Sequence, residues 1–162
     1  RDRVTGTLIE HIWDYQAIVW LQDNIQGSPV VLEAQTDQYQ WGARIANYTG
    51  LPTVLGWPWH QTQQRMEFAG AIWERRADVL EIYSTEDPDA AFDLLKKYQV
   101  EYIVIGQLEQ ARYPESGLQK FDDWAAEGLA TVVYPGPGTK IYGGLWYNKC
   151  TGFQVDSAWD LP

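Results

Sequence analysis

Two acidic residues lie close together near a short apolar run at the start of the chain. Glu33 ends the run 29–33, and Asp37 and Tyr39 follow it. Neighbouring carboxylates can act as acid and base, or bind hydroxyl groups. The alternative is that Asp37 caps a helix and Glu33 lies on the surface. The sequence marks Glu33 and Asp37 as candidate catalytic residues and Tyr39 as a candidate binding residue.

An aromatic, proline-containing segment follows at residues 56–60. Two tryptophans flank a proline, which predicts a stiff loop whose rings suit the apolar face of a sugar. Histidine titrates near neutral pH, so it can serve as acid or base, although packing or capping is the alternative role for a single histidine. His60 is therefore a further candidate catalytic residue. The candidate binding residues of this region are Trp57, Trp59, His60, Gln64 and Arg65.

Arginine suits the fork-like binding of carboxylate or phosphate groups, whereas pairing with the abundant acids is the alternative role. The basic residues that stand out are Arg44, Arg75, Arg76 and Lys120. Arg44 joins the candidate binding residues, as do Glu109 and Tyr113, which come after a later predicted strand. With two histidines and the single cysteine Cys150, a multi-histidine site and a cysteine-based zinc site are excluded. We expect no metal and no cofactor in this domain.

The composition limits the classes of partner. The chain has 162 residues, with 22 acidic and 12 basic side chains and a net charge of −10. Such a charge repels phosphate backbones, so we expect no nucleic-acid partner. The length fits one domain, and the sequence contains no apolar stretch long enough for a membrane span.

The candidate residues must be positioned by strands and helices, which the sequence also predicts. Apolar periodicity and turn residues predict strands over 29–33, 53–55, 100–105, 130–134 and 140–142, and helices over 8–25, 39–48, 61–80, 87–97 and part of 113–127. In the first helix we expect a broad apolar face, with one stripe through Ile12, Tyr15, Val19 and Gln22 and with Ile18, Leu21 and Ile25 beside it. The pattern predicts an α/β fold with a mostly parallel sheet flanked by helices and a C-terminal antiparallel hairpin. Residues 1–143 are expected to form a single domain, with 144–162 as a tail packed on it or extending from it.

Ligands of parallel sheets bind beyond the carboxyl ends of the strands. In this chain the rule points to residues 33–39, 56–60 and 106–113. We therefore expect the candidate residues to converge at one edge of the sheet.

The stretch 17–121 resembles a known family. The matching segments are Gly27-Ser-Pro-Val-Val-Leu-Glu-Ala34, Thr49-Gly-Leu-Pro-Thr-Val-Leu-Gly-Trp57 and Lys97-Tyr-x-Val-x-Tyr102. They resemble the C-terminal portion of the uncharacterised YYY multi-pass membrane proteins, whose layout is similar to that of the GT-C glycosyltransferases. The layout is also similar to the C-terminal domain of oligosaccharyltransferase catalytic subunits. Where those carry a Trp-Trp-Asp-Tyr-Gly acceptor motif, this chain has Leu32-Glu-Ala-Gln-Thr-Asp37, a departure from peptide-acceptor recognition.

The resemblance implies an extracytoplasmic C-terminal domain of a membrane-anchored GT-C-like glycosyltransferase. Such a domain assists the binding of an acceptor or lipid-linked sugar and contacts the membrane-spanning portion of the same chain. The parent protein would use a polyprenyl-phosphate sugar, with its catalytic carboxylate in a segment upstream of this domain. Two alternatives stay open: a stand-alone carbohydrate-active hydrolase using Glu33, Asp37 and His60, and a purely structural domain that docks on the membrane portion.

Overall fold

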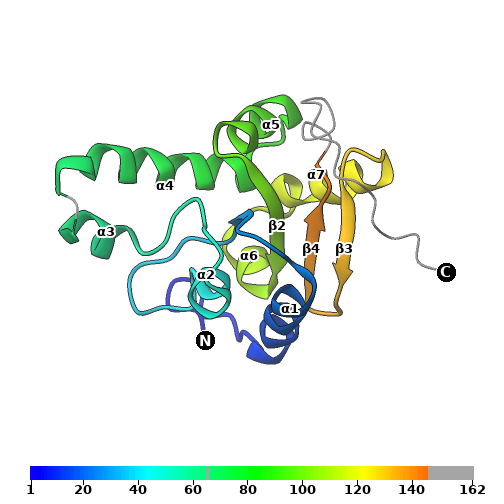
Figure 1. Cartoon of the computed structure of the whole chain (residues 1–162), viewed down its shortest axis with the longest axis horizontal. Helices are drawn as coiled ribbons and strands as arrows, with labels where there is room; N and C mark the ends of the chain where they lie inside the picture. Colours follow the sequence, from blue (N-terminus) through cyan, green and yellow to red (C-terminus); the bar gives the residue numbers. More distant parts are fainter. Residues whose placement is uncertain (65, 146–162) are drawn as a thin grey trace.

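The computed structural model describes residues 1–64 and 66–145 as a sheet between two layers of helices (Figure 1). Among these residues, none of the helices has the length and apolar character that crossing a bilayer requires. The strands are β1 (Val30–Leu32), β2 (Val100–Gly106), β3 (Thr131–Pro135) and β4 (Thr139–Gly143). The helices are α1 (His11–Asn24), α2 (Arg44–Thr49), α3 (Pro58–Gln64), the 3-10 helix η1 (Met66–Phe68), α4 (Ala69–Ser84), α5 (Pro88–Lys97), α6 (Gln107–Arg112) and α7 (Glu115–Ala126).

The sheet is mixed, which corrects the expectation of a mostly parallel sheet. Its strand order is β1-β2-β4-β3, with β1 parallel to β2 and β4 antiparallel to both of its neighbours. The strand expected over 53–55 is reduced to a bridge between Val31 and Thr53. Pro52 precedes it and has no N–H with which to extend a ladder. The expected C-terminal hairpin is present as the antiparallel pair β3 and β4.

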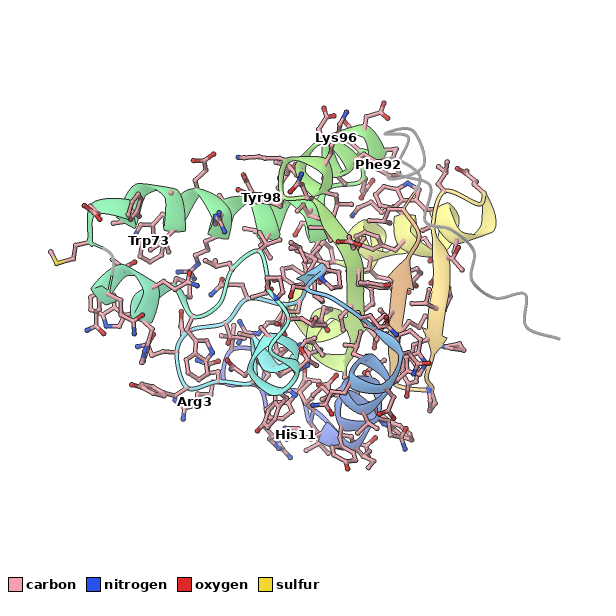
Figure 2. The ribbon with its side chains drawn as sticks, in the orientation of Figure 1. Arg3, His11, Trp73, Phe92, Lys96 and Tyr98 are labelled. Atoms are coloured by element: carbon pink, nitrogen blue, oxygen red, sulfur yellow. The ribbon has the colours of Figure 1, made fainter. Side chains whose placement is uncertain are left out.

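Alternating side chains of the strands face two separate apolar cores. One face packs against α1 and α2, and the other packs against α4, α5 and α7 (Figure 1). The side chains of the first face include Val31, Val104 and Ile141. The side chains of the second face include Leu32, Ile103 and Tyr142. On that side Phe92 of α5, labelled in Figure 2, stacks on Trp124 with ring centroids 4.0 Å apart.

Helix α1 buries only part of the broad apolar face that its sequence predicts. Its buried residues are Asp14, Ala17, Ile18 and Leu21. Of the expected face, Ile18 and Leu21 are buried, whereas Ile12 and Tyr15 are 50% and 62% exposed, so the expectation is wrong for the stripe through Ile12 and Tyr15. The inward position of Asp14 lets its carboxylate pair with the buried Arg44 at 2.6 Å. Because an unpaired buried charge is very costly, this pairing decides the rotation of the helix.

Other helices follow local signals to different degrees. Asp87 accepts hydrogen bonds from the amides of Asp89 and Ala90, which confirms the expected start of α5. The segment 56–60, expected to be irregular, instead starts α3 at Pro58, because proline is well tolerated in a first helical turn. The short helix α6 gave no signal in the sequence. Of the tail expected over 144–162, the residues from 146 onward lie outside the described residues, and Leu145 is buried.

A glycine allows α7 to approach the end of α4. A Cβ atom on Gly117 would lie 2.5 Å from the carbonyl oxygen of Tyr83 and 2.6 Å from that of Ser84. We expect Gly117→Ala to lower the free energy of unfolding by about 2–4 kcal/mol, since backbone atoms cannot move aside cheaply. Urea denaturation followed by circular dichroism measures the change.

The matched control is Gly70→Ala in α4, where a Cβ atom would meet no atom within 4 Å. Because alanine is the better helix former, this variant should be as stable as the parent chain or up to about 1 kcal/mol more stable. Equal stability of the two variants would contradict the close packing of α7 on α4.

Candidate functional site

Arg44 is buried at the carboxyl edge of the two parallel strands, where it contacts three carboxylates. Its guanidinium lies 2.6 Å from Asp14, 2.8 Å from Glu109 and 4.0 Å from Glu33, measured between the nearest nitrogen and oxygen atoms. All four side chains are at most 2% exposed. We call these four residues the Arg44 cluster.

The carboxylates of the Arg44 cluster also bind backbone groups from distant segments. Glu109 accepts hydrogen bonds from the amides of Ala34 (2.7 Å) and Gly106 (2.8 Å), at the ends of the parallel strands. Glu33 accepts from the first-turn amides of α2, at Ile45 (2.8 Å) and Ala46 (2.9 Å). The cluster therefore ties β1, α2 and β2 together through satisfied buried charges.

Asp14 completes these links from the other side of the cluster. Its carboxylate accepts hydrogen bonds from the indole nitrogen of Trp41 (2.6 Å) and the hydroxyl of Thr139 (3.0 Å). Asp14 is absent from the candidates that the sequence predicts, although one signal was present: it is an acid four residues before Ile18, and hence on the same helix face as buried apolar residues.

Burial raises the pKa of Glu33 to about 7, against the opposing attraction of Arg44. The neighbouring carboxylate of Glu109 adds to this rise. Both carboxylate oxygens of Glu33 already accept backbone hydrogen bonds, and the side chain is shielded from solvent. In this arrangement Glu33 positions α2 and does not reach a surface ligand.

The loop between β1 and α2, residues 33–43, is held by further contacts along its length. The amide of Gln35 donates to the hydroxyl of Tyr113 at 3.3 Å, and the amide of Gly42 donates to the hydroxyl of Thr36 at 3.1 Å. Trp57 donates from its indole nitrogen to the carbonyl of Gly42 at 3.1 Å. These hydrogen bonds fix the shape of the loop and hold the segment 56–60 next to it.

Three of the expected binding residues meet beside this loop: Tyr39 comes from the loop, Trp57 from the segment before α3 and His60 from α3. The ring centroids of Tyr39, Trp57 and His60 lie 5.1 to 5.7 Å from one another. The hydroxyl of Tyr39 lies 2.8 Å from Nε2 of His60. Tyr39 has a left-handed backbone with φ of 59° and is 71% exposed. We call these three residues the aromatic cluster, which offers exposed ring surface beside two polar groups.

A cavity of about 370 Å³ lies beyond the carboxyl end of β1, between α4 and the end of α6. Its lining residues are Val4, Thr5, Gln35, Trp73, Arg76, Ala77, Leu80, Arg112 and Tyr113. We call it the arginine cavity. Asp37 of the loop lies 3.8 Å from Arg76, so the loop borders both the arginine cavity and the aromatic cluster. Of its lining, sequence analysis proposed Tyr113 as a binding residue and noted Arg76 only as a basic residue.

The candidate catalytic residues have separate surroundings. Glu33 contacts Arg44 and the start of α2, Asp37 is exposed beside Arg76, and His60 contacts the aromatic cluster. These contacts share no partner, so the structure does not bring the three into one contact network. In the described residues, no group of three histidine, cysteine or acidic side chains is arranged to hold a metal ion.

The remaining proposed binding residues are divided between interior and surface. Arg44 and Glu109 are buried in the Arg44 cluster, whereas Trp59 and Gln64 are exposed on α3. Arg65 lies outside the described residues.

Comparison with known proteins finds a shared fold. No family model matches the chain, and no curated protein matches its sequence. The fold is similar to that of the C-terminal globular domain of an oligosaccharyltransferase from Archaeoglobus fulgidus, known from a crystal structure. The TM-score is 0.52 at 12% sequence identity, and the match covers 84% of this chain and 99% of that chain. This similarity shows the α/β architecture that the layout of the sequence predicts.

Removing the central cation should be severely destabilising. Arg44→Met leaves buried carboxylates without a counter-charge, so the free energy of unfolding should fall by about 3–5 kcal/mol. Chemical denaturation measures the loss. The control is Lys97→Met, which removes an exposed cation from Glu74 and Asp78 and should change stability far less, because solvent screens exposed ion pairs. Comparable losses of unfolding free energy in the two variants would show that the Arg44 cluster stabilises the fold no more than an exposed ion pair does.

The raised pKa of Glu33 gives stability a defined pH dependence. The folded state holds the proton more tightly than the unfolded state, so this contribution is complete below pH 4.5 and is lost as the pH rises to about 7. At about 1.4 kcal/mol per pKa unit, the loss is about 3 kcal/mol. Glu33→Gln removes this titration, so its unfolding free energy should vary less over that interval than in the parent chain. Parallel pH profiles for the two proteins would contradict the raised pKa.

Proposed function

We propose that the chain is a domain of a GT-C-like membrane glycosyltransferase and that it binds the glycan of an acceptor or of a lipid-linked sugar. The observation that carries the proposal is the aromatic cluster, with the exposed ring of Tyr39 on a loop that buried charges fix and with Trp57 and His60 beside it. The fold similarity to an oligosaccharyltransferase domain supports the same class of parent protein. We further propose that the domain faces the extracytoplasmic side and packs on the membrane-spanning portion of the same chain.

The aromatic cluster has the chemistry that a sugar requires. Rings of Tyr39 and Trp57 offer apolar surface for the C–H face of a pyranose. The hydroxyl of Tyr39 and the imidazole of His60, 2.8 Å apart, supply a donor and an acceptor for sugar hydroxyl groups. Sugar binding therefore uses groups that are already in place.

Preorganisation strengthens such a site. The loop 33–43 is tied to the Arg44 cluster through the amide of Ala34 and the indole of Trp41. Trp57 is tied to the same loop through the carbonyl of Gly42. Binding then needs little ordering of the backbone, which reduces its entropic cost.

The proposal assigns binding to this domain and catalysis to the rest of the parent protein. The acids at the sheet edge are engaged with Arg44 and backbone amides, so they serve the structure. A polyprenyl-phosphate sugar would be the donor for the parent protein. The domain alone should therefore bind glycans weakly and show no transfer or hydrolysis.

Saturation-transfer NMR with a panel of neutral oligosaccharides tests the proposal. The parent chain should give signals for at least one glycan, and Trp57→Ala, His60→Ala and Tyr39→Ala should each weaken binding by about tenfold, or 1.4 kcal/mol. Tyr15→Ala is the matched control, since Tyr15 is an exposed aromatic residue on α1. It should leave binding unchanged.

A folded chain that binds no glycan in the panel would contradict glycan binding by this domain. The exposed rings of Tyr39 and Trp59 would then favour the alternative of a purely structural domain, with these rings docked on the membrane portion. Hydrolysis of a glycan by the isolated chain would favour the alternative of a self-contained hydrolase.

A further inference from the structure

The arginine cavity has two cationic side chains in its lining, and their carboxylate partners Asp2 and Asp37 lie outside that lining. The protein carries 22 acidic and 12 basic residues, yet the lining of this cavity includes two arginines and no carboxylate residue. Guanidinium groups bind phosphate or carboxylate oxygens through paired hydrogen bonds. The cavity is therefore a local exception that favours an anionic ligand.

Arg112 is held in a fixed orientation, and some of its hydrogen-bond donors are not used in doing so. Its Nε and Nη2 atoms donate to Asp2 at 3.0 and 2.6 Å, and Nη2 also donates to Gln40 at 3.0 Å. Among the hydrogen bonds of the described residues, none uses Nη1 of Arg112. The carboxylate of Asp2 thus neutralises part of the charge while it orients the guanidinium, which keeps donors for a further acceptor.

Arg76 is the more available cation of the arginine cavity. Its ion pair with Asp37 is long, at 3.8 Å, and the two side chains are 43% and 60% exposed. Exposed pairs of this kind contribute little, so an anion with better geometry can replace Asp37. The guanidinium lies 5.3 Å from the ring centroid of Trp73, a contact that holds it at the wall of the cavity.

Part of the remaining wall is apolar. Val4, Trp73, Ala77 and Leu80 line the same cavity as the two arginines, and Trp73 and Leu80 are exposed. A small inorganic anion would leave this apolar surface in water. A ligand that joins an anionic group to an apolar chain covers both parts of the lining.

We propose that the arginine cavity binds the phosphate group of an amphiphilic phosphate ester, with Arg76 and Arg112 on the phosphate and Trp73 and Leu80 on the apolar chain. The inference deepens and rests on the proposed function, because a lipid-linked sugar belongs to this ligand class. The cavity and the aromatic cluster share the loop 33–43, so one ligand can place its phosphate in the first and its sugar near the second.

NMR titration of the isotopically labelled full chain tests the proposal with geranyl phosphate, inorganic phosphate and uncharged geraniol as probes. Geranyl phosphate should shift the amides of the residues that line the arginine cavity. It should bind at least about tenfold more tightly than either of the other probes, since each supplies only half of the required chemistry. Its affinity should fall as salt is added.

Arg76→Gln should weaken the binding of geranyl phosphate by about tenfold or more. Leu80→Ser, which leaves both arginines in place, should weaken the binding of geranyl phosphate but not the binding of inorganic phosphate. The matched control is Lys96→Gln: Figure 2 shows Lys96 on α5, well away from Trp73 on α4. This variant loses the same charge and should bind as the parent chain does.

Binding of geraniol as tight as that of geranyl phosphate, or an equal loss in Lys96→Gln and Arg76→Gln, would overturn the proposal. The proposal would also be overturned if inorganic phosphate bound as tightly as geranyl phosphate. Neutral glycans, titrated into the same samples and followed at Tyr39 and His60, report separately on the aromatic cluster. Glycan binding without ester binding would therefore refute this inference and leave the proposed function standing.

Discussion

The rest of the structure depends on the buried ion pairs between the guanidinium of Arg44 and its three carboxylate partners. One cation lies among the carboxylates of Asp14, Glu33 and Glu109, all shielded from water. Desolvating these charges is costly, and the cost is offset because the carboxylates also accept hydrogen bonds from surrounding backbone amides. The fold must place those segments together for any of these charges to be buried. The rotation of α1, the start of α2 and the path of the loop 33–43 follow from that requirement.

Because the Arg44 cluster uses these carboxylates in the interior, other groups must provide any ligand contacts at the surface. Glu33 and Glu109 are used to hold the ends of β1 and β2, so the carboxyl edge of the sheet presents rings and guanidinium groups to solvent. Such groups recognise ligands by stacking and by paired hydrogen bonds. This edge supports the binding role that we propose, because its buried carboxylates are already engaged with Arg44 and backbone amides.

Local signals predicted much of the fold. Asp87 marked the start of α5, the alternation of glycine and proline marked the β3–β4 hairpin, and the apolar run at 100–105 marked β2. The buried side of α1 was predicted in part, through Ile18 and Leu21, but the inward position of Asp14 could not be read locally, because its partner is Arg44, thirty residues later. Sequence also singled out Glu33 and Arg44 but could not distinguish a catalytic acid from a buried one, since burial depends on the packed fold. The arginine cavity combines residues of the N-terminal segment, α4 and α6, which only the folded chain brings together.

Native-state amide hydrogen exchange tests the central role of the Arg44 cluster most directly. The amides of Ala34, Ile45, Ala46 and Gly106 donate to its carboxylates. If the cluster holds the fold together, these amides exchange only when the whole domain unfolds, with the same free energy as the amides in the ladder of the central strand β2. Exchange through local opening, at rates close to those of exposed loop amides, would contradict this account.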